Sequence, residues 1–294
     1  MPASLRPVLD LAHDMWRFDA PRLNFETSFG TLAWERGGYG ESHRIERDGR
    51  LIGWARLTPG YDRIRRMGEW DVAPPMLTWL VDRREPDSLD LLAALVRWAD
   101  DLGGDRYTTS HAQADHEAAA ILGSLGFAPD PTEPFGLYLQ QSVGAPAAPY
   151  LDGYRFVTMA ELDDVEMRAA AHRAGWEAST FSADDVRRTM DSWPYRADLD
   201  LVALTAADEP VGAAIVWFDE SYDYGEFEPV GVSPGHRGVG LGAALMRAGL
   251  HRLHRVGASH AVVGARGDDD YPLARRLYRS VGFETFTTQV VVAR

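Results

Sequence analysis

The sequence contains neither cysteine nor lysine. Without cysteine the chain has no disulfide, thiol nucleophile or thiolate metal site. Without lysine, it has no lysine-dependent catalysis. All 30 basic residues are therefore arginines, and 44 Asp and Glu outnumber them for a net charge of -14. This acidity disfavours nucleic acid and anionic membranes as partners and suits a cationic substrate such as an amine.

Long apolar runs and targeting signals are also lacking. No stretch is apolar over the length needed to cross a membrane, and the first 25 residues lack a basic segment followed by an apolar one. We therefore expect a cytoplasmic protein. The nine histidines do not follow metal-ligand spacing, so we expect no metal. With 294 residues, 45% of them hydrophobic, the chain is long enough for two domains.

The chain divides at a segment rich in Pro, Ala and Gly, residues 143–150, which has no periodicity and is typical of a linker. The flanking parts, 1–142 and 151–294, resemble each other weakly. Ala118–Phe127 and Ala274–Phe283 both end in Gly-Phe and carry Ser three residues before the Phe. Residues 47–55 and 207–215 both read as a turn entering a strand. An internal duplication explains both matches.

Alternating and helical periodicities predict a mixed α/β fold for the second half. A good N-cap at Ser182 opens one of its helices. We expect strands at 154–157, 199–205, 213–218, 226–232, 260–265 and 285–293, and helices at 159–174, from 182, at 238–255 and at 272–280.

The chemistry is concentrated between the strand at 226–232 and the following helix, in the loop that contains Arg237 and glycines 238, 240 and 242. Unpaired amides at a helix N-terminus, the helix dipole and an arginine together favour a bulky anion. The spacing is Gly-x-Gly-x-Gly rather than the Gly-x-Gly-x-x-Gly of dinucleotide-binding folds, and the lysine of a nucleotide-hydrolysing loop is absent. A turn that merely caps the helix is the remaining structural reading.

This loop, preceded by Val230, Val232 and Pro234, resembles the acetyl-coenzyme A loop of the GNAT (N-acetyltransferase) superfamily. The later segment from Ala274 to Phe283 resembles the family's second conserved helix and following strand. The resemblance covers residues 151–294 well and 30–140 weakly. It implies two tandem GNAT-like domains, each with a mixed, mostly antiparallel sheet flanked by helices.

The resemblance also implies roles for individual residues. Val230 and Val232 would offer backbone groups to the pantetheine arm. Tyr278 would protonate the departing thiolate. The family often has Asn seven residues before that tyrosine, where this chain has Tyr271, which puts one pantetheine contact in doubt. The pyrophosphate would be held by the loop residues Arg237, Gly238, Val239, Gly240, Leu241, Gly242 and Ala243.

Acetyl transfer to an amine needs a group that accepts a proton, and Glu226 and Glu228 are the candidates. On a regular strand both would share a face with Val230 and Val232. The spacing of Glu226 from Arg237 matches the general base of histone-acetylating members of the family, whereas Glu228 lies closer to the expected thioester. Both could instead line an acidic acceptor pocket, and the sequence does not choose between them.

Aromatic and acidic residues predict where the amine acceptor enters. We expect it between the first helices of the second half and the central strands, where aromatic rings and carboxylates together suit an amine with an apolar body. Two of the tryptophans could equally be core residues. The candidates are Trp176, Tyr195, Trp217 and Glu220.

The first half lacks the features of a cofactor site. In its alignment with the second half, Gly240 becomes Ser88, Gly242 becomes Asp90 and Tyr278 becomes Leu122. Carboxylates at 85, 87 and 90 would repel a pyrophosphate. We therefore expect 1–142 to be a degenerate copy that lacks the acetyl-CoA loop and 151–294 to be the catalytic domain.

These observations favour an acetyl-CoA-dependent N-acetyltransferase in which a primary amine of a small molecule or peptide attacks directly in a ternary complex. The tandem arrangement also resembles mycothiol-synthase-like enzymes, whose acceptor is an amino-sugar conjugate. A non-catalytic acyl-CoA sensor or scaffold is the alternative from another class. The oligomeric state could be monomer or homodimer.

Overall fold

The computed structural model describes residues 5–35, 40–66, 69–102, 106–145, 148–176, 179–221 and 223–294. They form two compact units. The first unit takes Met1–Tyr138, Ala265–Arg275 and Thr285–Arg294, and the second takes Leu139–Gly264 and Arg276–Glu284. Each unit therefore draws on both halves of the sequence. The predicted division at 143–150, into a degenerate and a catalytic domain, separates the two copies of the repeat, whereas the two units are defined by packing. That division stays a prediction.

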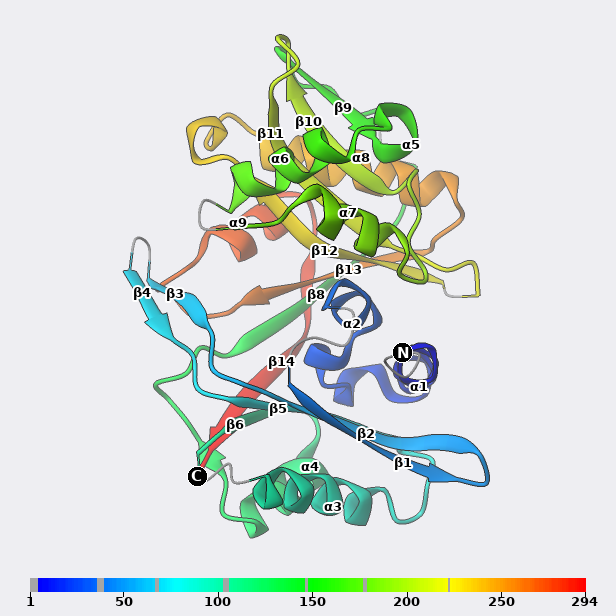
Figure 1. Cartoon of the computed structure of the whole chain (residues 1–294), viewed down its shortest axis with the longest axis vertical. Helices are drawn as coiled ribbons and strands as arrows, with labels where there is room; N and C mark the ends of the chain where they lie inside the picture. The colour runs from blue at the N-terminus through cyan, green and yellow to red at the C-terminus, as the bar shows by residue number, and fades with distance from the viewer. Residues whose placement is uncertain are drawn as a thin grey trace. The chain divides into compact units, whose positions relative to one another are not determined.

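The first unit is built on the strand order β1-β2-β5-β6-β14, with β7 beside β14. Helices α1 and α2 cover one face of these strands, and α3 and α4 cover the other (Figure 1). On the α3 face, Leu92, Leu95 and Val96 are fully buried. Before the linker, the elements are α1 (Arg6–Asp19), η1 (Ala20–Arg22), η2 (Phe25–Thr27), α2 (Phe29–Glu35), β1 (Glu41–Arg47), β2 (Arg50–Thr58), β3 (Asp62–Arg66), β4 (Glu69–Val72), β5 (Met76–Val81), α3 (Ser88–Asp101), β6 (Thr108–Ala112), α4 (His116–Ser124), β7 (Ala128–Pro129) and β8 (Gly136–Ser142).

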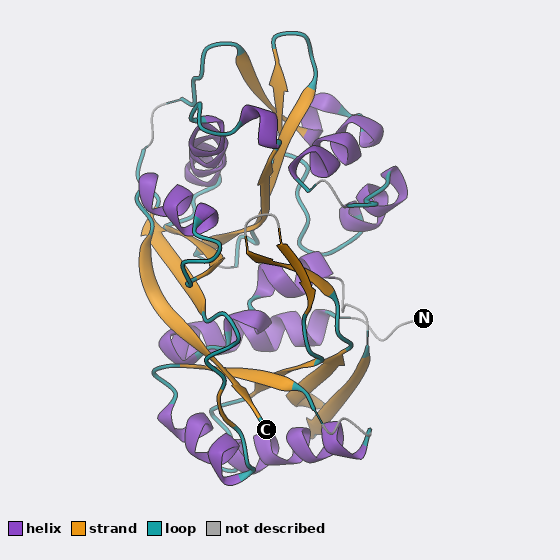
Figure 2. Ribbon diagram, turned by 90° about the vertical axis from the view of Figure 1, so that its left-hand side faces the viewer, coloured by secondary structure: helices purple, strands orange, loops and turns teal. Residues whose placement is uncertain are grey.

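The second unit has the strand order β8-β13-β12-β11-β10-β9. Strands β9 to β12 pair antiparallel, whereas β12 and β13 pair in parallel and are joined by α8. Helices lie on both sides of the strands (Figure 2). After the linker, the elements are β9 (Tyr154–Thr158), α5 (Met159–Leu162), α6 (Val165–Gly175), α7 (Ala183–Met190), β10 (Asp200–Thr205), β11 (Pro210–Trp217), β12 (Tyr224–Val232), η3 (Pro234–His236), α8 (Leu241–Arg255), β13 (His260–Arg266), α9 (Leu273–Ser280) and β14 (Glu284–Ala293).

The mixed α/β class predicted from the sequence is confirmed, and two helix boundaries differ. The helix expected over 159–174 is two helices, because Asp163 adopts a left-handed conformation with φ of 48° and Asp164 then caps α6 through the amide of Met167. The helix expected from Gly238 begins at Leu241, since Gly238 and Gly240 have positive φ. The cap predicted at Ser182 is present.

The predicted repeat is visible in the ends of α4 and α9. The amide of Phe127 donates to the carbonyl of Leu122 at 3.0 Å, and that of Phe283 donates to Tyr278 at 3.1 Å. The glycine before each phenylalanine is left-handed, as the sequence predicts for a helix C-cap. Leu122 and Tyr278 therefore occupy equivalent positions in the two copies. Among the described residues, no helix is long and apolar enough to span a membrane.

Candidate active site

The predicted anion loop joins β12 to α8 in the second unit. Gly238 and Gly240 have φ of 79° and 90°, values that residues other than glycine adopt only with strain. Gly240 is the N-cap of α8, so the amides that follow it have no partner within the helix. The loop from Arg237 to Gly240 is exposed. These are the backbone features of helix N-termini that bind anions, and the binding role of the loop stays a prediction.

Neighbouring elements hold this loop in place. The amide of Ser233 donates to Val211 at 2.8 Å, and the Tyr154 hydroxyl lies 2.9 Å from Nδ1 of His236. The Nε of Arg237 donates to the carbonyl of Val232 at 3.0 Å. Arg237 has no ion-pair partner within the described part of the chain, so its guanidinium charge remains available to an anion.

Strands β12 and β13 separate just before the loop. Their parallel pairing runs from Tyr224 with His260 to Phe227 with Val263. Strand β12 continues to Val232, still paired with β11 on its other edge. Residues 228–232 thus border a wedge between two parallel strands, where an extended ligand could hydrogen bond to the backbone as an added strand does.

A β-bulge interrupts β12 beside this wedge. Ala214 faces Val230 and Val216 faces Phe227, so Ile215 alone lies opposite both Glu228 and Pro229. Directly opposed residues share a face of the sheet. Glu226, opposite Trp217, therefore lies on the other face from Val230 and Val232. The expectation that Glu226 shares their face is wrong, because the extra residue shifts the alternation.

The two candidate bases differ in environment. Glu226 is 1% exposed and lies on the same face as Gly231, against which Trp176 of the α6 side packs. Glu228 is partly exposed, and its carbonyl accepts a 2.6 Å hydrogen bond from the Trp217 indole. Glu226 is thus the carboxylate on the α6 face, where the acceptor is expected.

Tyr278 lies on α9 and is 6% exposed. Its ring packs 6.2 Å from Phe283, whose ring in turn lies 6.1 Å from Phe227 of β12. Leu277 of the same helix packs within 3.1 Å of the position that a Cβ at Gly242 would take. Helix α9 therefore packs against the start of α8 and against Phe227, the last residue of β12 that pairs with β13. The acid role of Tyr278 stays a prediction.

Two of the predicted acceptor residues are joined to a buried ion pair that sequence reasoning missed. Tyr195 and Trp217 pack edge to face at 6.4 Å, and the Tyr195 hydroxyl donates to Asp200 at 3.0 Å. Asp200 also accepts from Nε of Arg168 at 2.6 Å, and both side chains are 1–2% exposed. Burial raises the pKa of Asp200, opposed by the Arg168 charge, and burial also raises the pKa of Tyr195. No local sequence signal marks this pair.

The other two predicted acceptor residues make different contacts. Trp176 stacks on His172 with ring centroids 4.4 Å apart. Glu220 is 85% exposed in the loop after β11 and lies 3.7 Å from Arg196. Trp217 is fully buried, so it packs against Tyr195 and offers no surface to a ligand. In the described ranges, no three histidine or acidic side chains gather as a metal site.

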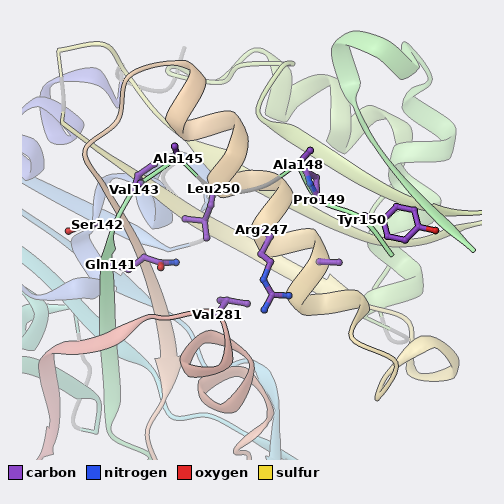
Figure 3. A pocket seen from close by; sticks show the side chains of 12 residues that line it. Gln141, Ser142, Val143, Ala145, Ala148, Pro149, Tyr150, Arg247, Leu250 and Val281 are labelled. Atoms are coloured by element: carbon purple, nitrogen blue, oxygen red, sulfur yellow. The ribbon is translucent and has the colours of Figure 1, made fainter. Parts of the chain in front are cut away.

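A pocket of about 510 Å³ opens along the outer side of α8. Figure 3 shows Arg247 of α8 directed into it, with Gln141 and Val281 at its edges. Arg247 makes no ion pair with any side chain that the structure describes. The pocket therefore places a second available cation two helical turns beyond Gly240.

Comparison with known proteins finds, over most of the chain, the family that the sequence resembles. The model of the acetyltransferase (GNAT) family matches residues 165–283. A mycothiol acetyltransferase of Nocardia farcinica is 31% identical over 261 residues, which cover 84% of this chain and 80% of the relative. A second one, from Mycolicibacterium vanbaalenii, is 32% identical over 260 residues with the same coverages.

Solved structures match the fold over the whole length. A GCN5-related N-acetyltransferase from Sphaerobacter thermophilus has a TM-score of 0.62 at 17% identity, covering 100% of this chain and 93% of its own. A tandem GNAT protein from the clavulanic acid biosynthesis pathway has a TM-score of 0.61 at 16% identity, covering 99% and 94%. The predicted tandem GNAT-like fold is therefore confirmed.

Proposed function

Since the chain belongs to the GNAT family of acetyltransferases, we propose that its second unit transfers the acetyl group of acetyl-coenzyme A to a primary amine of a small molecule. The observation that carries this proposal is the exposed glycine loop at the start of α8, placed where β12 leaves β13. A pyrophosphate fits the loop, and an extended amide-containing arm fits the wedge.

The cofactor would be held by residues of β12 and α8. Backbone groups of Val230 and Val232 border the wedge, and the loop from Arg237 to Ala243 would hold the pyrophosphate through its amides. Arg247 would offer its charge to the phosphate of coenzyme A that is not part of the pyrophosphate. When bound, acetyl-coenzyme A supplies an activated acetyl thioester.

The remaining chemistry belongs to side chains of the chain. An amine attacks only as the neutral base, so a carboxylate must take its proton. We assign this role to Glu226, because it is buried on the face where Trp176 lies, and we leave to Glu228 a supporting position at the bulge. The Tyr278 hydroxyl would deliver a proton to the departing sulfur.

The names of the relatives favour a more specific class of acceptor amine. Two mycothiol acetyltransferases align over 84% of this chain. We therefore add an amino-sugar conjugate with a primary amine as the specific acceptor class. The net charge of -14 agrees with attraction of such a cation.

The proposal is tested by coenzyme A binding and by acetylation of a panel of amines that includes an amino-sugar conjugate. Gly240→Glu should abolish binding, because it brings a carboxylate to the pyrophosphate position. Gly240→Ala is the matched control, since it adds the same backbone strain without the charge, and it should bind more tightly than Gly240→Glu. Tyr278→Phe should bind normally and turn over more slowly. Unchanged affinity in Gly240→Glu would refute the site, and tight binding without turnover on any amine would favour a sensor.

A further inference from the structure

The first unit contains a second copy of the wedge. Strands β5 and β6 are parallel and joined by α3, as β12 and β13 are joined by α8. They pair only at Met76 with Thr108 and at Leu77 with Thr109. Strand β5 then continues to Val81 and β6 to Ala112. The first unit therefore has the backbone framework that the proposed function uses for the cofactor arm in the second.

Side chains of the protein itself bridge this second wedge. The Trp79 indole donates to the carbonyl of Ser110 at 3.1 Å. Nδ2 of Asn24 donates to the same carbonyl at 3.1 Å, and the Ser110 hydroxyl donates back to Oδ1 of Asn24 at 3.1 Å. Asn24 is 3% exposed and Ser110 is 1% exposed. The Asn24 amide thus occupies a backbone acceptor of β6, the strand that corresponds to β13, inside the second wedge.

The segment around Asn24 is fixed on both sides. The Thr27 hydroxyl donates to the carbonyl of Asn24 at 2.6 Å. From β14, Gln289 donates to the carbonyl of Leu23 and Thr287 donates to that of Pro21, both at 3.0 Å. The cavity left beside the segment is about 20 Å³, which is room for one water molecule.

The start of α3 is also unlike the start of α8. No glycine lies between residues 82 and 91, and α3 begins at Ser88. Ion pairs hold acidic side chains here, including Arg47 with Asp87 at 2.7 Å and Arg84 with Asp82 at 2.8 Å. Arg47 and Arg50 also both pair with Glu85.

The ion pairs favour the charged forms of Asp82 and Asp87. A hydrogen bond from Arg47 lowers the pKa of Asp87. Burial works against ionisation of Asp82, but hydrogen bonds from Arg84 and Arg50 lower its pKa overall. The arginines beside the start of α3 are therefore already paired with carboxylates of the protein, which leaves them unavailable to a pyrophosphate.

We propose that the first unit is a self-occupied counterpart of the cofactor site. Residues 21–27 fill the place of the cofactor arm, and Asp82, Glu85 and Asp87 fill the place of the pyrophosphate. The protein then binds one acetyl-coenzyme A per chain, in the second unit. The location of the one cofactor site in the second unit rests on the proposed function. The closure of the first unit does not rest on it.

Titration calorimetry with coenzyme A on the full chain tests the stoichiometry. We expect one site per chain in the natural protein and none in Gly240→Glu. Two sites, or a site that survives in Gly240→Glu, would overturn the inference. No binding by the natural protein would overturn the proposed function while supporting the closure of the first unit.

Hydrogen exchange locates the binding and tests the role of Asn24. Saturating coenzyme A should slow amide exchange at 228–243 and leave 76–90 and 108–112 unchanged; slowing at 76–90 would overturn the inference. Asn24→Ala should speed exchange at 108–112 without ligand, whereas the exposed control Ser124→Ala should not. Equal exchange at 108–112 in both variants would show that the segment does not hold the wedge closed.

Discussion

At the scale of single residues, the bulge in β12 separates two carboxylates that are two positions apart in sequence. Glu226 is buried on the α6 face, and Glu228 lies partly exposed opposite Ile215. Only a carboxylate on the acceptor side can take a proton from the attacking amine. The two glutamates are therefore expected to differ in function despite their identical chemistry.

We predict that Glu226→Gln lowers turnover by about 100-fold or more, the range of a lost general base, with little change in coenzyme A affinity. Glu228→Gln is the matched control and should change turnover by less than about 10-fold. Steady-state rates across pH measure both, since loss of the base should also remove the acidic limb of the profile. A larger loss in Glu228→Gln would transfer the role to that residue.

The sequence predicted the position of the glycine loop correctly, but not the face of the sheet on which Glu226 lies. The glycine spacing and Arg237 located the loop, because helix N-terminal anion sites depend on local backbone chemistry. The face of Glu226 depends on one extra residue in a ladder with β11, and that pairing is not local. Likewise, Arg168 and Asp200 are 32 residues apart and carry no pattern that pairs them.

At the scale of elements, the contact between α6 and α7 contains a histidine that resists protonation. His172 is 7% exposed, and its ring packs at 4.4 Å on Trp176 and at 4.3 Å on Phe181. Burial, followed by the charges of Arg168 and Arg173, lowers its pKa to about 3. The unfolded chain binds a proton near pH 6.5, so the folded state loses stability as pH falls from 6.5 towards 3.

We predict that His172→Phe, which keeps a ring but cannot be protonated, removes about 2 kcal/mol of the difference in unfolding free energy between pH 7 and pH 5. Denaturant unfolding at the two pH values measures it. Asp200 has a raised pKa and contributes with the opposite sign, but it is present in both proteins and cancels in the comparison. An unchanged pH dependence in the variant would contradict the assignment to His172.

Element boundaries were predictable where capping decides them and missed where a single residue breaks a helix. The Ser182 cap and the glycines at 126 and 282 were predictable because they act within one turn. The break at Asp163 was missed, since a non-glycine residue with positive φ has no strong sequence signature. Asn24 gave no signal, because its partner Ser110 is 86 residues away.

At the scale of the whole molecule, the last strand of the sequence belongs to the first unit. Strand β14 pairs with β6 from Gln289 opposite Ala112 to Ala293 opposite Thr108. Val292 is 3% exposed in the core that α3 and α4 cover. The guanidinium of Arg294 lies 4.7 Å from the Phe127 ring. The tandem arrangement was predictable from the repeated motifs, but this assignment of β14 required the pairing itself.

We predict that Val292→Ala destabilises the first unit by about 1–3 kcal/mol through the cavity it leaves. Hydrogen exchange should accelerate at 108–112, about 180 residues earlier in the chain, with coenzyme A affinity unchanged. Val202→Ala in β10 is the matched control, because it removes the same atoms from a fully buried strand position of the second unit. Acceleration at 108–112 in the control, or its absence in Val292→Ala, would contradict the assignment.

The place of β14 also sets an order of events during synthesis. A ribosome adds about 5–20 residues per second, and domains generally fold from the N-terminus onward. Strand β6 leaves the ribosome long before β14, so one edge of β6 stays without its partner while the second unit is still being made. The half of the protein that is translated first is therefore the half whose sheet is completed last.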